Sequence, residues 1–417
     1  MKRSRSAILA TVTALAVAST ATWFAGSASA ATACASAWSA TAVYVNGNSA
    51  SQNSHNYTAK WWTQNESPDT HSGQWDVWAD NGACGGTTPT TPPTTAPTTA
   101  PTTAPTTTPP TTTPPSNGTL PAHFLTGYWQ NFYNGAAALK LAAVPSSYDL
   151  IAVAFADATS TPGAVSFTLD SGLASAVGGY TDAQFKADIA TVHAQGRKVV
   201  ISVGGANGAV GVGDATAATN FATSVYSLMQ AYGFDGVDID LENGINSTYM
   251  ASALRSLRAK AGSSLIITMA PQTIDMQSTG SSYFALALSI KDILTVVYTQ
   301  YYNSGSMLGC DNNAAYAQGT ENFLVALACI QLQNGLRPDQ VALGLPASTS
   351  AAGGGYVAPS VVNAALDCLA AGTNCGSFRP PATYPGLRGA MTWSINWDVS
   401  NGSGFANTVK PHLSTLP

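Results

Sequence analysis

A stretch composed almost entirely of Thr and Pro interrupts the chain from Gly85 to about Gly118. Such a segment lacks the apolar side chains needed for a core, and its prolines favour an extended polyproline II conformation. It therefore predicts a semi-rigid linker at residues 85–118. This linker divides the chain into a small N-terminal module and a much larger C-terminal one.

The N-terminus has the three-part pattern of an export signal. Three basic residues lie within the first five positions, followed by an apolar run from Ala7 to Val17 and the small residues Ala28–Ala30. This order is typical of a secretory signal peptide at residues 1–30. The alternative is a membrane anchor, but polar residues from Ser19 onward end the run before the roughly 20 apolar residues that a span needs. We therefore expect a secreted, extracellular protein.

The charge of the chain narrows the range of partners. The formal net charge is −5, and it becomes −8 when the three basic residues of the signal peptide are removed. An acidic surface on which only 9% of all residues are charged suits neither nucleic acid nor an anionic membrane. We expect a monomer that binds a neutral, hydroxyl-rich partner and needs no cofactor.

Cysteine and histidine positions predict disulfides and no metal site. Cys34 and Cys84 bracket the small module, and an exported protein is expected to form disulfides, so we expect these two to pair. The other four cysteines allow three pairings, of which we favour the one between sequence neighbours: Cys310 with Cys329, and Cys368 with Cys375. The histidines never cluster with the spacing of metal ligands; they are His55, His71, His123, His193 and His412.

The small module, residues 31–84, is predicted to be all-β. Short runs of β-forming residues, such as 41–45 and 57–63, are separated by Asn, Gly and Ser. A module of this size cannot form a sufficient hydrophobic core, which gives the disulfide a physical reason. It is also unusually rich in aromatic residues: Trp38, Tyr44, Tyr57, Trp61, Trp62, Trp75 and Trp78.

The large module, residues 119–417, alternates β-type runs with helical patterns. In the helical stretch after the fourth run, Met250, Leu254, Leu257 and Ala261 form one apolar stripe. Eight strand and helix units in this length predict a (β/α)₈ TIM barrel; a doubly wound fold is the alternative, but the first run lacks the Gly-rich loop of that fold. The candidate strands are His123–Trp129, Leu150–Phe155, Lys198–Val203, Gly236–Asp240, Leu265–Met269, Ile293–Tyr301, Val341–Leu345 and Ala390–Ser394.

The fourth candidate strand ends in alternating carboxyl groups, Asp238, Asp240 and Glu242. Successive side chains of a strand face opposite sides, so these three would line the barrel interior while the apolar residues between them face the helices. Like charges held this closely cannot all ionise, so at least one pKa must rise and a proton must be shared. A solvated strand with alternating acids is the alternative, but its apolar opposite face argues against it. Glu242 lies nearest the C-terminal end of the strand, where such barrels place their active sites, which indicates a general acid.

These residues resemble the motifs of a known enzyme family. The stretch from Asp235 to Glu242 matches every fixed position of Asp-Gly-x-Asp-x-Asp-x-Glu, the signature of family 18 glycoside hydrolases. The segment from Ser202 to Gly205 is similar to the family's Ser-x-Gly-Gly motif. The segment Gln300-Tyr301-Tyr302-Asn303 resembles the plant hevamine-type branch, although Asn303 replaces the Asp of that branch. Trp393 matches the tryptophan that forms the floor of the family's cleft.

The resemblance implies a chitinase that hydrolyses β-1,4 bonds between N-acetylglucosamine units of chitin and its oligosaccharides. Glu242 would be the general acid and base, and the substrate's own 2-acetamido oxygen would be the nucleophile. Asp240 would orient the acetamido group, Asp238 would share a proton with Asp240, and Tyr302 would donate a hydrogen bond to the acetamido oxygen. Further implied substrate contacts are Phe155, Met269, Gln272, Gln300, Asn303 and Trp393.

The small module resembles the carbohydrate-binding modules of families 5 and 12. The resemblance rests on the segment 59–64, on Trp75 and Trp78, and on the bracketing cysteines. It implies chitin binding by Trp61 and Trp62. Because adjacent residues of a strand face opposite sides, one of these two rings should be exposed and able to stack on a sugar.

Three other functions fit parts of this pattern. An endo-β-N-acetylglucosaminidase that trims N-glycans would not need a polymer-binding module and a long linker. A lectin on an inactive barrel would lack the acid, whereas Glu242 is intact, and a cellulase would not need the acidic motif with Tyr302. Only 44 residues separate Leu345 from Ala390, which leaves no room for an additional domain that would wall in the cleft. We therefore expect an open groove and endo-acting cleavage.

Overall fold

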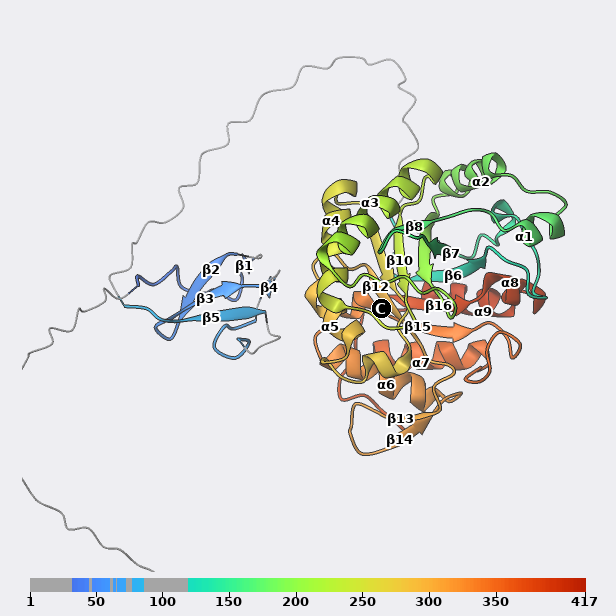
Figure 1. Ribbon diagram of the computed structural model, residues 1–417. Coiled ribbons are helices and arrows are strands. Elements are labelled where there is room, and N and C mark those ends of the chain that lie inside the picture. Colours follow the sequence, from blue (N-terminus) through green and yellow to red (C-terminus); the bar gives the residue numbers. More distant parts are fainter. Residues whose placement is uncertain (1–31, 45–46, 61–62, 65, 73–76, 86–118) are drawn as a thin grey trace, which may run out of the picture. The chain divides into compact units, whose positions relative to one another are not determined.

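The computed structural model describes residues 32–44, 47–60, 63–64, 66–72, 77–85 and 119–417, which form two compact units (Figure 1). The predicted signal peptide, the linker beyond Gly85, and the side chains of Trp61, Trp62 and Trp75 lie outside the described residues. The domain boundaries at residues 30, 84 and 118 remain predictions.

Within its described residues, the N-terminal unit contains strands and no helix. Its three-stranded antiparallel sheet consists of β2 (Ser49–Gln52), β3 (His55–Ala59) and β5 (Trp78–Ala83), and a second pair is formed by β1 (Val43–Tyr44) and β4 (Thr63–Gln64). The predicted disulfide between Cys34 and Cys84 is present. The core is small: Ala50, Tyr57, Ala59, Val77 and Trp78 are buried, with Trp38 and Tyr44 packed against them.

The C-terminal unit is a closed barrel of parallel strands. Each barrel strand pairs with the next, and β6 also pairs with β7 to close the ring (Figure 1). The (β/α)₈ prediction is confirmed, and the alternative of an open doubly wound sheet is wrong. The barrel strands are β6 (Phe124–Gln130), β7 (Leu150–Ala158), β9 (Lys198–Gly204), β10 (Gly236–Asp240), β11 (Ile266–Met269), β12 (Val296–Gln300), β15 (Val341–Pro346) and β16 (Gly389–Trp393).

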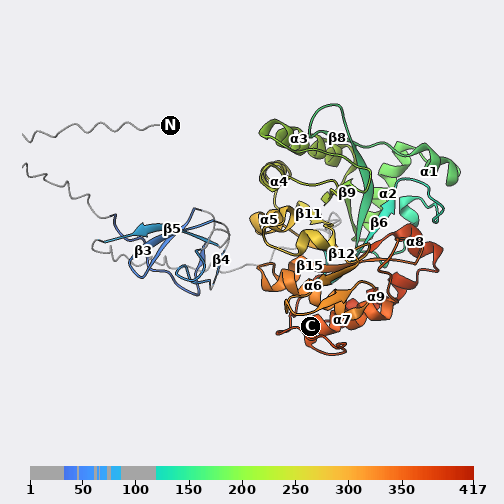
Figure 2. The same cartoon turned by 60° about the horizontal axis from the view of Figure 1, so that its bottom comes forward.

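The helices surround the barrel strands (Figure 2). Residues at the helix ends explain their limits: Asp214 accepts a hydrogen bond from Ala217 N at the start of α3, and Gly233 ends that helix in the left-handed conformation. The predicted stripe of α4 is buried at Met250, Leu254 and Leu257. The helices are α1 (Ser171–Ala176), α2 (Asp182–Ala194), α3 (Ala215–Tyr232), α4 (Ser247–Ala261), α5 (Ser282–Ser289), α6 (Glu321–Gln333), α7 (Pro359–Ala371), α8 (Ile395–Ser400) and α9 (Gly404–Leu413).

Smaller elements decorate the loops of the barrel. β8 (Val165–Ser166) adds to β7 in antiparallel orientation, and β13 (Ser306–Leu308) and β14 (Ala315–Ala317) form a hairpin after β12. Three 3₁₀ helices are η1 (Leu141–Ala143), η2 (Thr273–Met276) and η3 (Pro338–Gln340). The disulfide between Cys310 and Cys329 ties the hairpin to α6, and Cys368 pairs with Cys375, so both predicted pairings are confirmed.

Two separate groups of buried side chains follow from the alternation along the strands. One group fills the barrel interior and includes Tyr128, Val200 and Tyr298. The other lies between the strands and the helices and includes Val237, Ile239 and Leu241 of the acidic segment. The predicted orientation of that segment is therefore correct, since its apolar residues face the helices.

The barrel strands start within one residue of the predicted positions except at the sixth strand, and β7 ends at Ala158 rather than at Phe155. The sixth strand begins at Val296 rather than Ile293, because residues 291–293 form a turn after α5. Between β15 and β16 the only regular element is α7, so no additional domain is inserted there. Among the described helices, none is long and apolar enough to cross a bilayer.

Candidate active site

Asp238 is fully buried inside the barrel, and three hydroxyl groups donate to its carboxyl group. Tyr128 and Ser202 each donate to Oδ2 at 2.6 Å, and Thr268 donates to Oδ1 at 2.6 Å. Burial raises the pKa of Asp238, and these three hydrogen bonds oppose the rise because they favour the charged form. The three donors come from β6, β9 and β11, so the fold itself assembles this site from separate parts of the chain.

Asp240 lies two residues further along β10, and its carboxyl group is held by one amide. Gln300 Nε2 donates to Oδ1 at 2.8 Å and also to the backbone oxygen of Ala270 at 2.8 Å. Burial, then the charges of Asp238 and Glu242, hold the pKa of Asp240 well above its ordinary value. Asp240 therefore binds a proton more readily than Asp238, which has three donors instead of one.

Glu242 follows the end of β10 and is partly exposed in a cavity of about 650 Å³. The cavity lies at the C-terminal ends of the barrel strands, where Asp240, Gln300 and Trp393 also line it. No Lys, Arg or His is among its described lining residues. The cavity thus combines a solvent-accessible carboxyl group with a buried one beside it.

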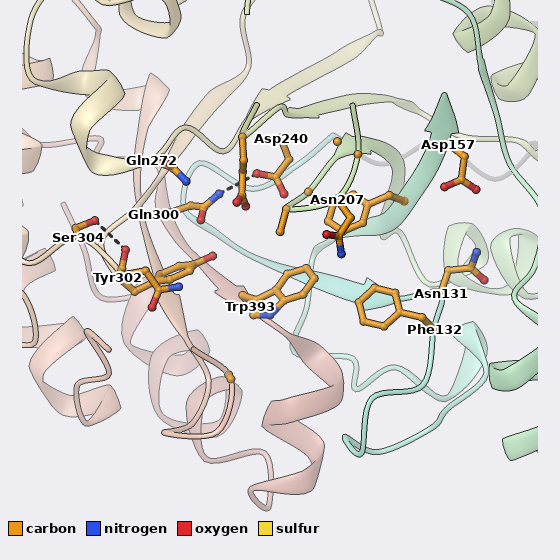
Figure 3. Close-up of a pocket in the computed structure, with 18 of the residues that line it drawn as sticks. Asn131, Phe132, Asp157, Asn207, Asp240, Gln272, Gln300, Tyr302, Ser304 and Trp393 are labelled. Atoms are coloured by element: carbon orange, nitrogen blue, oxygen red, sulfur yellow. Dashed lines mark hydrogen bonds between the residues drawn. The ribbon is translucent and has the colours of Figure 1, made fainter. Parts of the chain in front are cut away.

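The aromatic side chains of Phe132, Phe155, Tyr302 and Trp393 line this cavity. Trp393 stacks on Phe155 with ring centroids 5.9 Å apart and lies 5.5 Å from the ring of Tyr128. Trp393 lies between Tyr302 and Phe132 in Figure 3. Tyr302 is only 9% exposed, and burial, then the charges of Asp240 and Glu242, raise the pKa of its hydroxyl group well above the ordinary value. Tyr302 therefore keeps its proton and can donate it in a hydrogen bond.

Most residues predicted to contact substrate line this cavity. Phe155, Gln272, Gln300, Asn303 and Trp393 all do so, together with Asp240, Glu242 and Tyr302. Figure 3 shows Gln272, Gln300 and Tyr302 on one side of the cavity, with Trp393 next to Tyr302.

The structure corrects the prediction for Met269. Its side chain is fully buried between the barrel and the helices, and it does not line the cavity. The reason is strand alternation: Thr268 faces the interior and bonds Asp238, so the adjacent Met269 must face outward.

Several cavity residues were not predicted from the sequence. Asn131, Phe132, Asp157, Asp170 and Asn207 line the cavity, and Figure 3 shows Asn131, Phe132 and Asp157 on the side of Trp393 away from Tyr302. Asn131 Oδ1 accepts from Asp170 N at 3.0 Å, which links two of these loops. Asp157 lies at the end of β7, and the others lie in the loops after β6, β8 and β9. Only the rule that barrel sites form at the C-terminal ends of strands could have pointed to them.

The first aspartate of the acidic segment lies at the opposite end of the strand from the cavity. Asp235 bonds His193 Nε2 at 2.7 Å, Lys198 Nζ at 3.1 Å and Val199 N at 2.8 Å. Burial alone would raise the pKa of Asp235, but these hydrogen bonds and charges lower it overall. Asp235 therefore anchors the start of β10 and takes no part in the cavity.

In the described part of the chain, no three His, Cys, Asp or Glu residues are grouped so that they could hold a metal ion. The polar side chains that line the cavity carry carboxyl, amide, hydroxyl and phenol groups. The fold and this site are those of a barrel enzyme with an aromatic-lined cleft at the C-terminal ends of its strands.

The chain belongs to family 18 of the glycoside hydrolases, because the model of "Glycosyl hydrolases family 18" matches residues 125–410. It is 38% identical over 333 residues to Chitinase D of Niallia circulans, which covers 70% of this chain and 62% of that protein. The chain thus spans less than two thirds of the length of that relative.

Two crystal structures are also similar to this chain. A protein described as Chitinase A from Streptomyces coelicolor is 66% identical, with a TM-score of 0.69 and coverage of 71% of this chain and 99% of that one. A family 18 chitinase from Chromobacterium violaceum is 32% identical, with a TM-score of 0.66 and coverage of 92% and 100%.

Proposed function

We propose that this chain is a secreted chitinase that hydrolyses β-1,4 bonds between N-acetylglucosamine units by a substrate-assisted, retaining mechanism. The observation that carries the proposal is the row of Asp238, Asp240 and Glu242, which leads from the buried barrel interior into a cavity that Trp393 also lines. Similar proteins are named chitinases, which supports the choice of substrate.

The first step places positive charge beside Asp240. Glu242 gives its proton to the glycosidic oxygen, and the bond between that oxygen and the anomeric carbon breaks. The carbonyl oxygen of the substrate's 2-acetamido group forms a new bond to the same carbon, which yields a cyclic oxazolinium ion. Tyr302, which keeps its proton, is suited to donate a hydrogen bond to that carbonyl oxygen.

Asp240 and Asp238 respond to that charge as a pair. In the free site, the proton shared by the pair resides on Asp240, since three hydroxyl donors favour the charged form of Asp238. Positive charge on the substrate favours ionised Asp240, and its proton can then pass to Asp238. The ionised carboxylate accepts the N–H of the acetamido group. Water then attacks the anomeric carbon, the bond between that carbon and the acetamido oxygen breaks to restore the acetamido group, and the water gives a proton to Glu242, which restores the acid.

The placement of the carboxyl groups argues against a protein nucleophile. Asp240 is the last residue of β10 and lies beside Glu242, two residues further on, so it cannot reach the opposite side of the sugar ring. Asp157 lies beyond Trp393 near Asn131 in Figure 3, away from Asp240. Asp170 caps α1, with its Oδ1 accepting from Leu173 N at 2.7 Å. The acetamido oxygen is the nucleophile that remains.

Partly deacetylated chitosan tests this mechanism. A glucosamine unit at the cleavage site has an amine in place of the amide and offers no internal nucleophile. We expect every new reducing end to carry N-acetylglucosamine, and fully deacetylated polymer to remain intact. Sequencing the new reducing ends decides the question, because a large share of glucosamine ends would rule out the substrate-assisted route. Glu242→Gln, which lowers the rate by about 10³-fold through loss of the transferable proton, is the inactive control.

The N-terminal unit is proposed to bind chitin and to keep the barrel close to an insoluble substrate. Its aromatic content supports this role, since Trp38 and Tyr44 are only partly buried and pack at the edge of a very small core. Trp61 and Trp62 are the proposed sugar-stacking residues. The three disulfides support export, because disulfides form in oxidising compartments outside the cytoplasm.

A further inference from the structure

Leu241 separates the two carboxyl residues of the cavity, and both polar atoms of the peptide group between Asp240 and Leu241 are held. The peptide consists of the carbonyl of Asp240 and the N–H of Leu241. The carbonyl accepts from Gly205 N at 2.7 Å, and the N–H donates to the hydroxyl oxygen of Tyr283 at 2.6 Å. The carbonyl partner comes from the loop after β9 and the N–H partner from α5, on opposite sides of β10 in the barrel order.

The Leu241 N–H is the first amide beyond the regular hydrogen bonds of β10. The last strand pairings of β10 are Asp240 with Gly204 of β9 and Ile239 with Met269 of β11. Beyond them the chain turns away from the sheet, and Glu242 lies in that turn. Because Leu241 is only 3% exposed, its N–H has no access to water and needs a protein partner. Tyr283 provides it.

The Tyr283 hydroxyl is suited to this task. The residue is 2% exposed, and its hydroxyl oxygen also lies 3.3 Å from the carbonyl oxygen of Leu241, to which it can donate. Burial, and then the charge of Asp240, raise the pKa of Tyr283 well above the ordinary value, so the hydroxyl keeps its proton. One phenol group therefore bonds both backbone polar atoms of the residue that precedes Glu242.

The hydrogen bonds of Tyr283 and Gly205 thus clamp the Asp240–Leu241 peptide from two sides. The side at the Asp240 carbonyl depends on a glycine. At Gly204 an added Cβ atom would lie 2.2 Å from the carbonyl oxygen of Asp240, and the backbone there has a φ of +123°. Only glycine permits this close approach. We infer that Tyr283 is a positioning residue for catalysis: together with the glycines after β9, its hydroxyl fixes the Asp240–Leu241 peptide and thereby the relative placement of the Asp240 and Glu242 carboxyl groups. This inference rests on the proposed function.

Tyr283→Phe tests the inference, because it removes the hydroxyl and keeps the ring. We expect kcat on a chitin oligosaccharide to fall roughly tenfold or more, with KM within about twofold, since small displacements of catalytic groups affect the transition state rather than binding. Tyr148→Phe is the matched control. It also removes a fully buried hydroxyl, which bonds Asp398 at 2.6 Å, but it has no link to β10. Its kcat, expressed per folded molecule, should stay within about twofold of the wild-type value.

Equal losses of kcat in Tyr283→Phe and Tyr148→Phe, or an unchanged kcat in Tyr283→Phe, would overturn the inference. If Tyr283→Phe shows no cooperative thermal transition, Gly204→Ala decides, because it displaces the same peptide from its other side. We expect the same loss of kcat at nearly constant KM there, and an unchanged kcat would refute the clamp. A wild-type protein without activity on chitin oligosaccharides would refute the proposed function instead.

Discussion

Nε2 of Gln300 lies 2.8 Å from Oδ1 of Asp240 and 2.8 Å from the backbone oxygen of Ala270. Both hydrogens of the amide are therefore committed, and the nitrogen acts only as a donor towards Asp240. Because Oδ1 accepts this bond, a proton on Asp240 resides on Oδ2. The orientation of the neutral carboxyl group is thus fixed before substrate binds.

Gln300→Met keeps the approximate size of the side chain and removes the donor. We expect kcat to fall roughly tenfold or more, because the carboxyl group of Asp240 loses its fixed orientation. Loss of a donor to the charged form also raises the pKa of Asp240 further. Steady-state kinetics on chitin oligosaccharides measure the effect. The control is Gln331→Met, which removes a buried amide bonded to Thr299 and Tyr301; full activity of Gln300→Met would contradict this role.

Asp240→Asn should lose activity but gain thermal stability at neutral pH. The pKa of Asp240 is raised in the folded state, so the unfolded chain gains a charge first as the pH rises, and the folded state loses stability above about pH 4. Asparagine resembles the protonated acid and avoids this loss. We expect a Tm higher than that of the wild type by on the order of a few degrees at pH 7, with the difference shrinking towards pH 4. A Tm difference that does not change with pH would contradict the raised pKa.

Replacing both Trp61 and Trp62 with Ala tests the role of the N-terminal unit. We expect adsorption to insoluble chitin to weaken by about tenfold, because exposed indole rings stack on sugar rings. Degradation of the insoluble polymer should slow, while turnover of soluble oligosaccharides stays almost unchanged. Equal losses on both substrates would mean that the unit supports folding of the barrel instead.

Cleavage should be internal rather than from chain ends. The connection between β15 and β16 carries only α7, so no inserted domain covers the cleft there. Two exposed apolar residues also directly follow residues that line the cavity: Tyr133 follows Phe132, and Leu308 follows Met307. We therefore expect the viscosity of a soluble chitin derivative to fall early in the reaction. Mainly disaccharide at the earliest times, with little loss of viscosity, would contradict endo cleavage.

Features that depend on residues close together in the sequence could be predicted. The alternation of carboxyl and apolar residues from Val237 to Glu242 gave the correct inward and outward faces, because a strand has a strict period of two. The neighbouring cysteines paired as expected, because short separations leave few alternatives. The same alternation rule, applied to Thr268, would also have excluded Met269 as a substrate contact.

Contacts between residues far apart in the sequence could not be predicted in this way. Tyr128 bonds Asp238 across 110 positions of sequence, and Tyr283 bonds Leu241 across 42. Nothing in the sequence around either tyrosine shows which group its buried hydroxyl would bond. Their roles depend on which strand or helix lies next to β10, and that is a property of the closed barrel.

The anchor at Asp235 has a consequence for the behaviour of the barrel in acid. The pKa of Asp235 is lowered in the folded state, so its contribution to stability is present above the ordinary pKa of 3.8 and disappears as the pH falls below it. Asp240, at the other end of β10, has the opposite dependence. Its contribution to stability weakens as the pH rises above the ordinary pKa of an aspartic acid. The two ends of β10 therefore respond to pH in opposite directions: acid weakens the ion pairs just before its first residue, and rising pH places an unfavourable charge at its last.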